Sequence, residues 1–328
     1  MNHKLIGVIR TATLTFLLIG IAFLYCPEVK SQERSEIKDK NKAYIVVLGT
    51  VQDAGSPHAA CQKACCKDLF DKPDPGRKVV SLGLIDQKFG KKYLFEATPD
   101  MTTQMKALAK LGVNGVNETP DGIFLTHAHI GHYTGLMYLG KEAMSANEVP
   151  VYAMPKMKSF LETNGPWSQL VANRNIVLKG IEDQKEVSLT AHLTVRALQV
   201  PHRDEYSETV GYVISGPNKS ALFIPDIDKW EKWELDIIDE IKKVDYAFLD
   251  ATFFDGKEIN NRDISEIPHP FIIESMERFK TMDLEEKDKI IFIHFNHTNP
   301  VLDPKSTASE TVLEKGFRIA RMGDVFEL

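Results

Sequence analysis

The segment Thr126-His127-Ala128-His129-Ile130-Gly131-His132 follows the apolar run Gly122-Ile123-Phe124-Leu125 and holds three of the ten histidines in the chain. Imidazole is the commonest metal-binding side chain, and its neutral form can coordinate a cation near neutral pH. In an extended segment, positions 127 and 129 point to the same side, so both can bind one ion. Gly131 lets the backbone bend away from the strand before His132. The segment therefore predicts a metal site at the end of a buried strand rather than a cluster of solvated histidines.

The composition is that of an ordinary globular protein. The chain has 328 residues, of which 43% are apolar and 26% are charged, so one large domain or two small ones are expected. The formal net charge of −6 gives no reason to expect nucleic acid or an anionic membrane surface as partner. We expect a small-molecule substrate, and the sequence leaves the oligomeric state open.

The N-terminus has the features of a secretory signal. Lys4 and Arg10 precede an apolar run over residues 14–25, and a polar stretch follows over residues 31–42. The run is short for a membrane span, which needs about 20 apolar residues. We predict a signal peptide over residues 1–31, a linker over 32–42 and one domain over 43–328. The mature protein would be exported, to a periplasm, and an uncleaved membrane anchor is the alternative.

Three cysteines lie together in Ala60-Cys61-Gln62-Lys63-Ala64-Cys65-Cys66, shortly after His58. In an exported chain they could form one disulfide and leave one thiol over. The adjacent Cys65 and Cys66 cannot easily bridge each other, because a disulfide needs a suitable separation and direction of its two residues. Three thiolates with His58 or Asp53 would instead make a closed tetrahedral zinc site of the structural type. We favour this structural metal and keep the disulfide as the alternative.

Beyond residue 42, short apolar runs alternate with amphipathic segments. Residues 43–48 are rich in β-branched and aromatic side chains and predict a strand, whereas residues 102–111 have the spacing of a helix. Further strands are expected at 79–86, 92–95, 149–154, 193–200, 209–214, 221–224, 246–249 and 290–295, and further helices at 157–163, 229–243 and 271–281. This pattern predicts an α/β protein with two sheets covered by helices.

Polar side chains follow three of these strands. His202 comes after the run that ends at Val200, Asp226 after the run that ends at Ile224, and His294 within the last run. Any one of them alone would more simply be a capping or turn residue. Together with the three histidines after Leu125, they predict a preorganised site at strand ends, where a rigid scaffold can hold it.

The order of these residues resembles the metallo-β-lactamase superfamily over residues 43–328. Its members place His-x-His-x-Asp-His after a strand, then a later His, an Asp and a final His. The resemblance implies a four-layer αββα sandwich that carries its metals at one edge between the sheets. It implies further that a first metal is bound by His127, His129 and His202, and a second by His132 and His294, with Asp226 bridging both and Glu96 supporting the histidines.

A narrower resemblance is to the coenzyme PQQ synthesis protein B family. It rests on the C-terminal segment 292–303, on Ala97-Thr98-Pro99-Asp100 and on the cysteine cluster after an early strand. The resemblance implies a part in making pyrroloquinoline quinone (PQQ), through a metal-dependent oxidative step or as a carrier.

Gly131 departs from the superfamily motif, which has an aspartate ligand of the second metal at that place. Glycine supplies neither an oxygen ligand nor a negative charge. Three interpretations stay open: one metal in the first site, a weaker second metal held by His132, Asp226 and His294, or Asp226 taking over as base. His297 is an alternative to His294, but the two would point to opposite faces of a strand, and we prefer His294.

The residues favour a metal-dependent hydrolase with one or two Zn²⁺ ions that acts on an ester or phosphodiester-like bond. The metal would lower the pKa of its bound water towards neutrality, and Asp226 would be the catalytic residue that orients or deprotonates this water. An oxidative enzyme of PQQ synthesis with Fe²⁺ is an alternative, because two histidines and an aspartate also suit a non-haem iron site. A non-catalytic PQQ carrier or binding protein is the third hypothesis.

Overall fold

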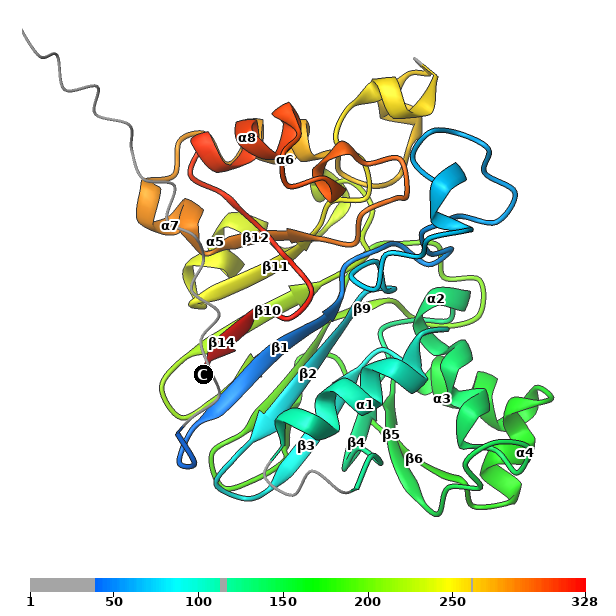
Figure 1. The fold of residues 1–328 in the computed structure, drawn as a ribbon. Coiled ribbons are helices and arrows are strands. Elements are labelled where there is room, and N and C mark those ends of the chain that lie inside the picture. Colours follow the sequence, from blue (N-terminus) through cyan, green and yellow to red (C-terminus); the bar gives the residue numbers. More distant parts are fainter. Residues whose placement is uncertain (1–38, 113–116, 261) are drawn as a thin grey trace, which may run out of the picture. The chain divides into compact units, whose positions relative to one another are not determined.

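Two mixed sheets lie face to face in the computed structural model, which describes residues 39–112, 117–260 and 262–328 (Figure 1). The order of the first sheet is β14 (Val325–Glu327), β1 (Ala43–Gly49), β2 (Ser81–Asp86), β3 (Lys91–Phe95), β4 (Gly122–Phe124), β5 (Val149–Ala153), β6 (Ile176–Gly180). The order of the second is β13 (Arg318–Ile319), β12 (Ile290–Ile293), β11 (Tyr246–Asp250), β10 (Ser220–Ile224), β9 (Val210–Ser215), β8 (Thr194–Gln199), β7 (Glu186–Ser188).

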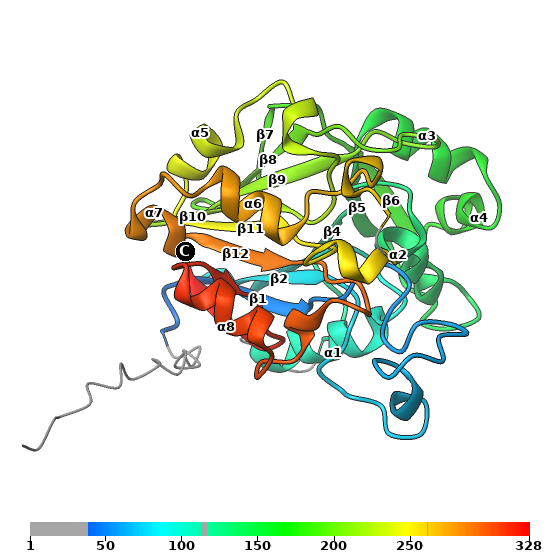
Figure 2. The ribbon, with the colours of Figure 1, turned by 90° about the horizontal axis from the view of Figure 1, so that it is seen from above.

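Helices cover the outer face of each sheet (Figures 1 and 2). On the first sheet these are α1 (Met101–Leu111), α3 (Pro155–Thr163) and α4 (Trp167–Ala172). On the second they are α5 (Ile237–Lys242), α6 (Ile272–Arg278), α7 (Leu284–Asp288) and α8 (Thr307–Glu314). The short helix α2 (Ile130–Tyr133) lies near one end of the sheets. The predicted αββα sandwich is therefore confirmed.

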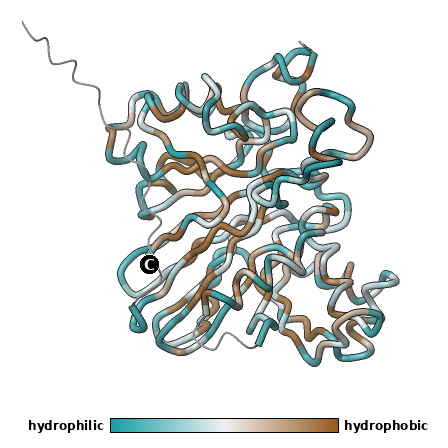
Figure 3. The backbone as a smooth tube through the Cα atoms, viewed as in Figure 1, coloured by the Kyte–Doolittle hydropathy of each residue, from teal (hydrophilic) through white to brown (hydrophobic). Residues whose placement is uncertain are grey.

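Side-chain alternation explains the four layers. Along β1, Ile45 packs with Phe95 and Phe223 in the core between the sheets, whereas the next residue, Val46, packs on the outer face with Met105 of α1. The strands are correspondingly apolar along their length, as the brown segments of Figure 3 show. Burying both faces of a sheet in this way requires near-continuous apolar strands, which is the pattern that made them recognisable in the sequence.

The predicted helix over residues 229–243 is wrong in its first half. The structure has a short 3-10 turn at Trp230–Lys232 and then α5, which begins after the N-cap Asp236. The indole N–H of Trp230 donates to Ser275 Oγ, and that of Trp233 donates to the carbonyl of Gln199. These tertiary hydrogen bonds hold the two indoles on different neighbours, so the segment between them does not continue as one helix.

Strand direction places the ends of the important strands together. In the first sheet β1, β3 and β4 run in the same direction, and in the second sheet β8, β10, β11 and β12 do so. Just beyond β1 and β12, Phe295 N–H donates to the carbonyl of Thr50 and Gln52 N–H donates to the carbonyl of Phe295, both at 2.8 Å. These two hydrogen bonds join the sheets at the C-terminal ends of their strands, where ligand sites of open α/β sheets form.

The predicted signal peptide, residues 1–31, and most of the predicted linker, 32–42, lie outside the described residues. Among the residues that are described, no helix is both long and apolar enough to cross a membrane.

Candidate metal centre

Side chains from both sheets meet at the edge where the strands end. One group consists of His127 and His129 after β4, His202 after β8 and Asp226 after β10. A second group consists of Asp53 after β1, His132 in α2, His294 after β12, and the same Asp226. Within each group the nearest ligand atoms all lie within 4.8 Å of one another. The geometry thus brings together all six residues that the sequence analysis selected, and it adds Asp53.

Asp226 is the common member of the two groups. Its Oδ2 lies 3.4 Å from His127 Nε2 and 3.3 Å from His202 Nε2 in the first group. It also lies 3.9 Å from Nε2 of both His132 and His294 in the second. Ligands about 2.1 Å from a tetrahedral ion lie roughly 3.4 Å from one another. The carboxylate therefore has the spacing of a ligand shared by two ions.

The residues present fit a divalent metal. His202 Nε2 is buried, points toward Asp226 and has no hydrogen-bond partner within the described part of the chain. An unsatisfied buried polar group costs about 1–3 kcal/mol, which a metal–nitrogen bond would remove. The donor set of imidazole nitrogens and carboxylate oxygens is the one that Zn²⁺ uses at catalytic sites, and it also suits iron.

The ring nitrogens that face away from the centre have partners of their own. Metal-binding histidines usually donate this second N–H to a carboxylate, hydroxyl or carbonyl group, which fixes the ring. The hydrogen-bond partners are Thr126 Oγ1 for His127 (2.9 Å), Asp228 Oδ1 for His202 (3.2 Å) and Thr252 Oγ1 for His294 (2.9 Å). His132 Nδ1 makes no hydrogen bond within the described residues, but Glu96 Oε1 lies 3.5 Å from it at ion-pair distance. Glu96 thus lies where the resemblance implied a supporting carboxylate.

Two of these residues have left-handed backbone conformations. Glu96, directly after β3, has φ of 75°, and His294, directly after β12, has φ of 68°. Such angles are rare for residues other than glycine and cost on the order of 1–3 kcal/mol each. In both cases the strand ends at the preceding residue. The unusual φ angle therefore directs the side chain of Glu96 or His294 toward the metal centre.

The electrostatics of the centre are those of paired acids and bases. Burial alone would raise the pKa of Asp53, but the charges of His132 and His294 and their hydrogen bonds hold it well below the usual range. Burial lowers the pKa of His127 well below its usual value, which keeps that imidazole neutral and able to bind a metal. Burial would also lower the pKa of His132, but Asp53 and Glu96 raise it well above the usual value. A metal at His132 would therefore have to displace a proton.

His269 belongs to the centre, although the sequence analysis missed it. Its Nδ1 lies 3.1 Å from Asp226 Oδ1 and 2.9 Å from Asp250 Oδ2. Burial would lower its pKa, but these two carboxylates raise it well above the usual value. The only sequence signal was a histidine held between Pro268 and Pro270 just before α6, with no regular spacing to the other histidines.

The solvent side of the centre is next to His129. Arg203 Nη2 lies 3.3 Å from His129 Nε2, and Glu205 Oε2 lies 3.4 Å from the same atom. The side chain of Arg203 is 62% exposed, whereas that of His129 is 13% exposed. A substrate approaching His129 would therefore meet the ion pair of Arg203 and Glu205.

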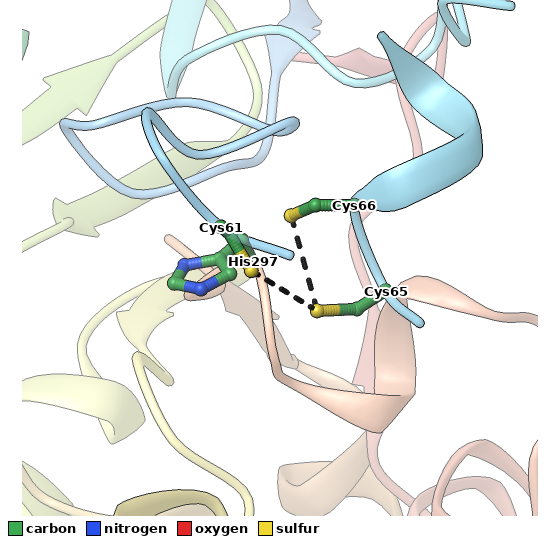
Figure 4. A group of neighbouring side chains, drawn as sticks. All are labelled: Cys61, Cys65, Cys66 and His297. Carbon is green, nitrogen blue, oxygen red and sulfur yellow. Dashed lines mark hydrogen bonds between the residues drawn. The ribbon is translucent and has the colours of Figure 1, made fainter. Parts of the chain in front are cut away.

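The three cysteines form a separate cluster, shown in Figure 4. Cys61 Sγ and Cys66 Sγ lie 4.0 Å and 3.8 Å from Cys65 Sγ, and all three are free thiols rather than a disulfide. The histidine whose ring nitrogen lies within 4.8 Å of these sulfur atoms is His297. The fourth member of the cluster is thus His297, in place of the predicted His58 or Asp53.

The physical reason for this difference lies in the loop. The ring of His58 lies against that of His297, with centroids 4.3 Å apart and planes tilted by 36°, and its Nδ1 lies 2.9 Å from the carbonyl oxygen of its neighbour Ala59. Its backbone N–H, not its ring, donates to Cys66 Sγ. The turn after β12 separates the two histidines whose roles the sequence left open, since His294 lies in the metal centre and His297 at the cysteine cluster.

Comparison with known proteins agrees with the fold. Residues 91–295 match the family described as the beta-lactamase superfamily domain. Coenzyme PQQ synthesis protein B of Methylococcus capsulatus is 24% identical over 308 residues, which cover 85% of this chain and 98% of that protein.

Two solved structures share the fold. The Zn²⁺-bound PqqB from Methylobacterium extorquens is 20% identical, with a TM-score of 0.70, and the match covers 87% of this chain and 100% of that one. A diphosphatase from the PhnP family is also 20% identical, with a TM-score of 0.59, and the match covers 88% of this chain and 97% of that one.

Proposed function

The chain belongs to the beta-lactamase superfamily, and from that premise we propose that it is a metal-dependent hydrolase that cleaves a phosphodiester or a related ester bond. The observation that carries the proposal is the position of Asp226, whose Oδ2 is shared by imidazoles of both ligand groups. Two adjoining groups that share a carboxylate would hold two ions side by side, and a pair of ions can together bind a water and a substrate oxygen.

The residues of the centre would divide the chemistry among them. His127, His129 and His202 would hold one ion, and His132 and His294 a second, with Asp226 between the two. Zn²⁺ at these positions would polarise the scissile bond and lower the pKa of water. Asp226 would orient the attacking water, because it lies between the two ligand groups and its Oδ1 makes no hydrogen bond within the described residues. His269 would help to position Asp226, because its Nδ1 lies between Asp226 Oδ1 at 3.1 Å and Asp250 Oδ2 at 2.9 Å.

Arg203 could bind an anionic group of a substrate that displaces its present partner Glu205, whose Oε1 lies 3.6 Å from Arg203 Nη1. Its guanidinium lies beside His129 at the solvent side of the centre, where it can pair with a phosphate group. A solved structure with the same fold is named as a diphosphatase of the PhnP family, so a phosphate-containing substrate is compatible with this fold.

The test is to purify the protein without added metal, count its metals by mass spectrometry, and assay bis(p-nitrophenyl) phosphate, a simple ester and a lactone. Zinc together with diester turnover is the expected result. A protein that binds no metal at His127, His129 and His202 would overturn the proposal.

A second function is favoured by the relatives named coenzyme PQQ synthesis protein B. In that case the centre would hold Fe²⁺ and carry out an oxidative step on a PQQ-related molecule, or the protein would bind such a molecule without reaction. Iron with consumption of O₂ in the presence of a PQQ precursor would favour the oxidative enzyme, and binding of PQQ without turnover would favour the carrier. We further propose that residues 1–31 direct export, which comparison of the intact mass of the secreted and cytosolic protein would test.

A further inference from the structure

Asp53 and Gly131 occupy complementary positions. Gly131 lies in α2 between the two ends of the histidine motif, and a Cβ atom built on it would fall 2.3 Å from Asp53 Cα, 2.6 Å from Asp53 Cβ and 2.9 Å from Asp53 Cγ. Real Cβ atoms do not approach other heavy atoms so closely. The side chain of Asp53 therefore fills the volume that any side chain at position 131 would need.

The carboxylate of Asp53 is directed at the second ligand group. Its Oδ1 lies 2.9 Å from His132 Nε2 and 3.2 Å from His294 Nε2, and only 12% of its side chain is exposed. With Asp226, these residues make two imidazoles and two carboxylates, which is a complete set of four N and O donors.

The backbone explains why Asp53 can reach this place. Phe295 N–H and Gln52 N–H form the two hydrogen bonds that join the end of β1 to the end of β12. Asp53 is the residue after Gln52, and His294 is the residue before Phe295. The same junction therefore brings the carboxylate and the imidazole together from opposite sheets.

We propose that Asp53 is the oxygen ligand of a second metal ion, and that Gly131 is glycine because Asp53 enters the centre from the loop after β1. This inference rests on the proposed metal centre and goes beyond it, because it replaces a weakened second site with a complete one. Of the three interpretations left open by Gly131, the second is extended: the second metal would be held by His132, His294, Asp226 and also Asp53.

The test compares the variants Asp53→Asn and Gly131→Ala with the natural protein and with the control Asp71→Asn, an exposed aspartate of the same loop. Each protein is dialysed against Zn²⁺, its bound metal is counted by mass spectrometry, and its fold is checked by circular dichroism. Asn has the size of Asp but no charge, so Asp53→Asn should keep the fold and tests the ligand directly. Ala is favoured over Gly within a helix, but its Cβ would displace the backbone of Asp53, so Gly131→Ala tests the packing of the two positions.

We expect Asp53→Asn and Gly131→Ala each to lose one zinc per chain, or to bind it at least 10-fold more weakly, while Asp71→Asn keeps the natural count. Substitution with Co²⁺ gives a readout independent of activity, since both variants should lose part of the visible absorption of nitrogen- and oxygen-bound cobalt. Natural zinc content in Asp53→Asn, or a natural protein with one ion in the centre, would overturn the inference but leave the hydrolase proposal standing. A centre without any metal in the natural protein would overturn both.

Discussion

The metal centre and the cysteine cluster share two segments of the chain, but they differ in what else holds them. The loop after β1 gives Asp53 to the centre and three cysteines to the cluster, and the turn after β12 gives His294 to the centre and His297 to the cluster. In the centre the remaining ligands follow strands of both sheets and are mostly buried. In the cluster all four side chains come from loops, and Cys61, Cys65 and His297 are partly exposed.

The two ligand sets are held in place by different structural elements. The centre is held by the sheets and by hydrogen bonds to the second ring nitrogens, so it is preformed. The cluster has no such scaffold, and burial together with the neighbouring thiols raises the pKa of Cys65 to about 12. The cluster would therefore gain its order from a metal that displaces the thiol protons, and in doing so it would fasten the loop that carries Asp53.

The largest effect is expected from a substitution that removes zinc from the centre and leaves the cluster intact. Asp226→Asn keeps the size of the side chain but removes the charge shared by the two ligand groups. We expect roughly a 10³-fold loss of diester hydrolysis and loss of zinc from the centre, with one zinc retained at the cluster. The control Asp239→Asn changes an exposed aspartate on α5 and should have natural activity and zinc content. Equal zinc content in Asp226→Asn and the natural protein would refute the shared ligand.

The converse substitution removes one ligand of the cluster and leaves the centre's ligands in place. Cys65→Ser should remove one zinc and destabilise the protein by about 3 kcal/mol, which lowers the melting temperature by roughly 6 °C. Zinc at His127, His129 and His202 should remain, whereas zinc at the Asp53 side should bind more weakly because the loop is no longer fastened. Calorimetry and metal counting check both statements, and a variant with natural zinc content and melting temperature would show that the cluster binds no metal.

A smaller effect is expected from the supporting shell of the centre. Glu96→Gln leaves every ligand in place but removes the charge that faces His132 Nδ1. Loss of such a partner weakens metal binding by about 10–100-fold, which competition with a chelator would measure. Glu162→Gln, on the exposed face of α3, is the control and should not change the affinity. An unaltered affinity in Glu96→Gln would mean that Glu96 is required only for the backbone turn.

The smallest effect concerns a carboxylate beside the cluster. Burial raises the pKa of Glu258 from 4.5 to about 7. The pKa of Asp53 in the centre shifts in the opposite direction, because histidines lower it. At Glu258 the folded state therefore binds more protons than the unfolded state between these values, so stability should fall as the pH rises through this window, by on the order of 2 kcal/mol. Urea unfolding at pH 4.5 and pH 7.5 should show this loss in the natural protein and a smaller one in Glu258→Gln. The prediction is wrong if, relative to Glu258→Gln, the natural protein gains stability between pH 4.5 and pH 7.5.

Much of the architecture follows from local sequence. The strands of the two sheets are apolar runs buried on both faces, and His127, His129, His202 and Asp226 come directly after such runs, so strand periodicity locates them. Asp53, His269 and the partner of the cysteines could not be found in this way. Their positions depend on the junction of Thr50 and Gln52 with Phe295, on a proline-bounded loop and on a turn of left-handed conformation at His294. These are tertiary contacts between segments more than 200 residues apart or turns without a periodic signal.

Anomalous X-ray scattering at the zinc edge from crystals of the natural protein would show whether two ions lie on either side of Asp226. We expect one anomalous peak among His127, His129 and His202 and a second among Asp53, His132 and His294, with Asp226 in contact with both. A separate peak is expected at the cysteine cluster. A single peak confined to the cluster, with none beside Asp226, would contradict the account.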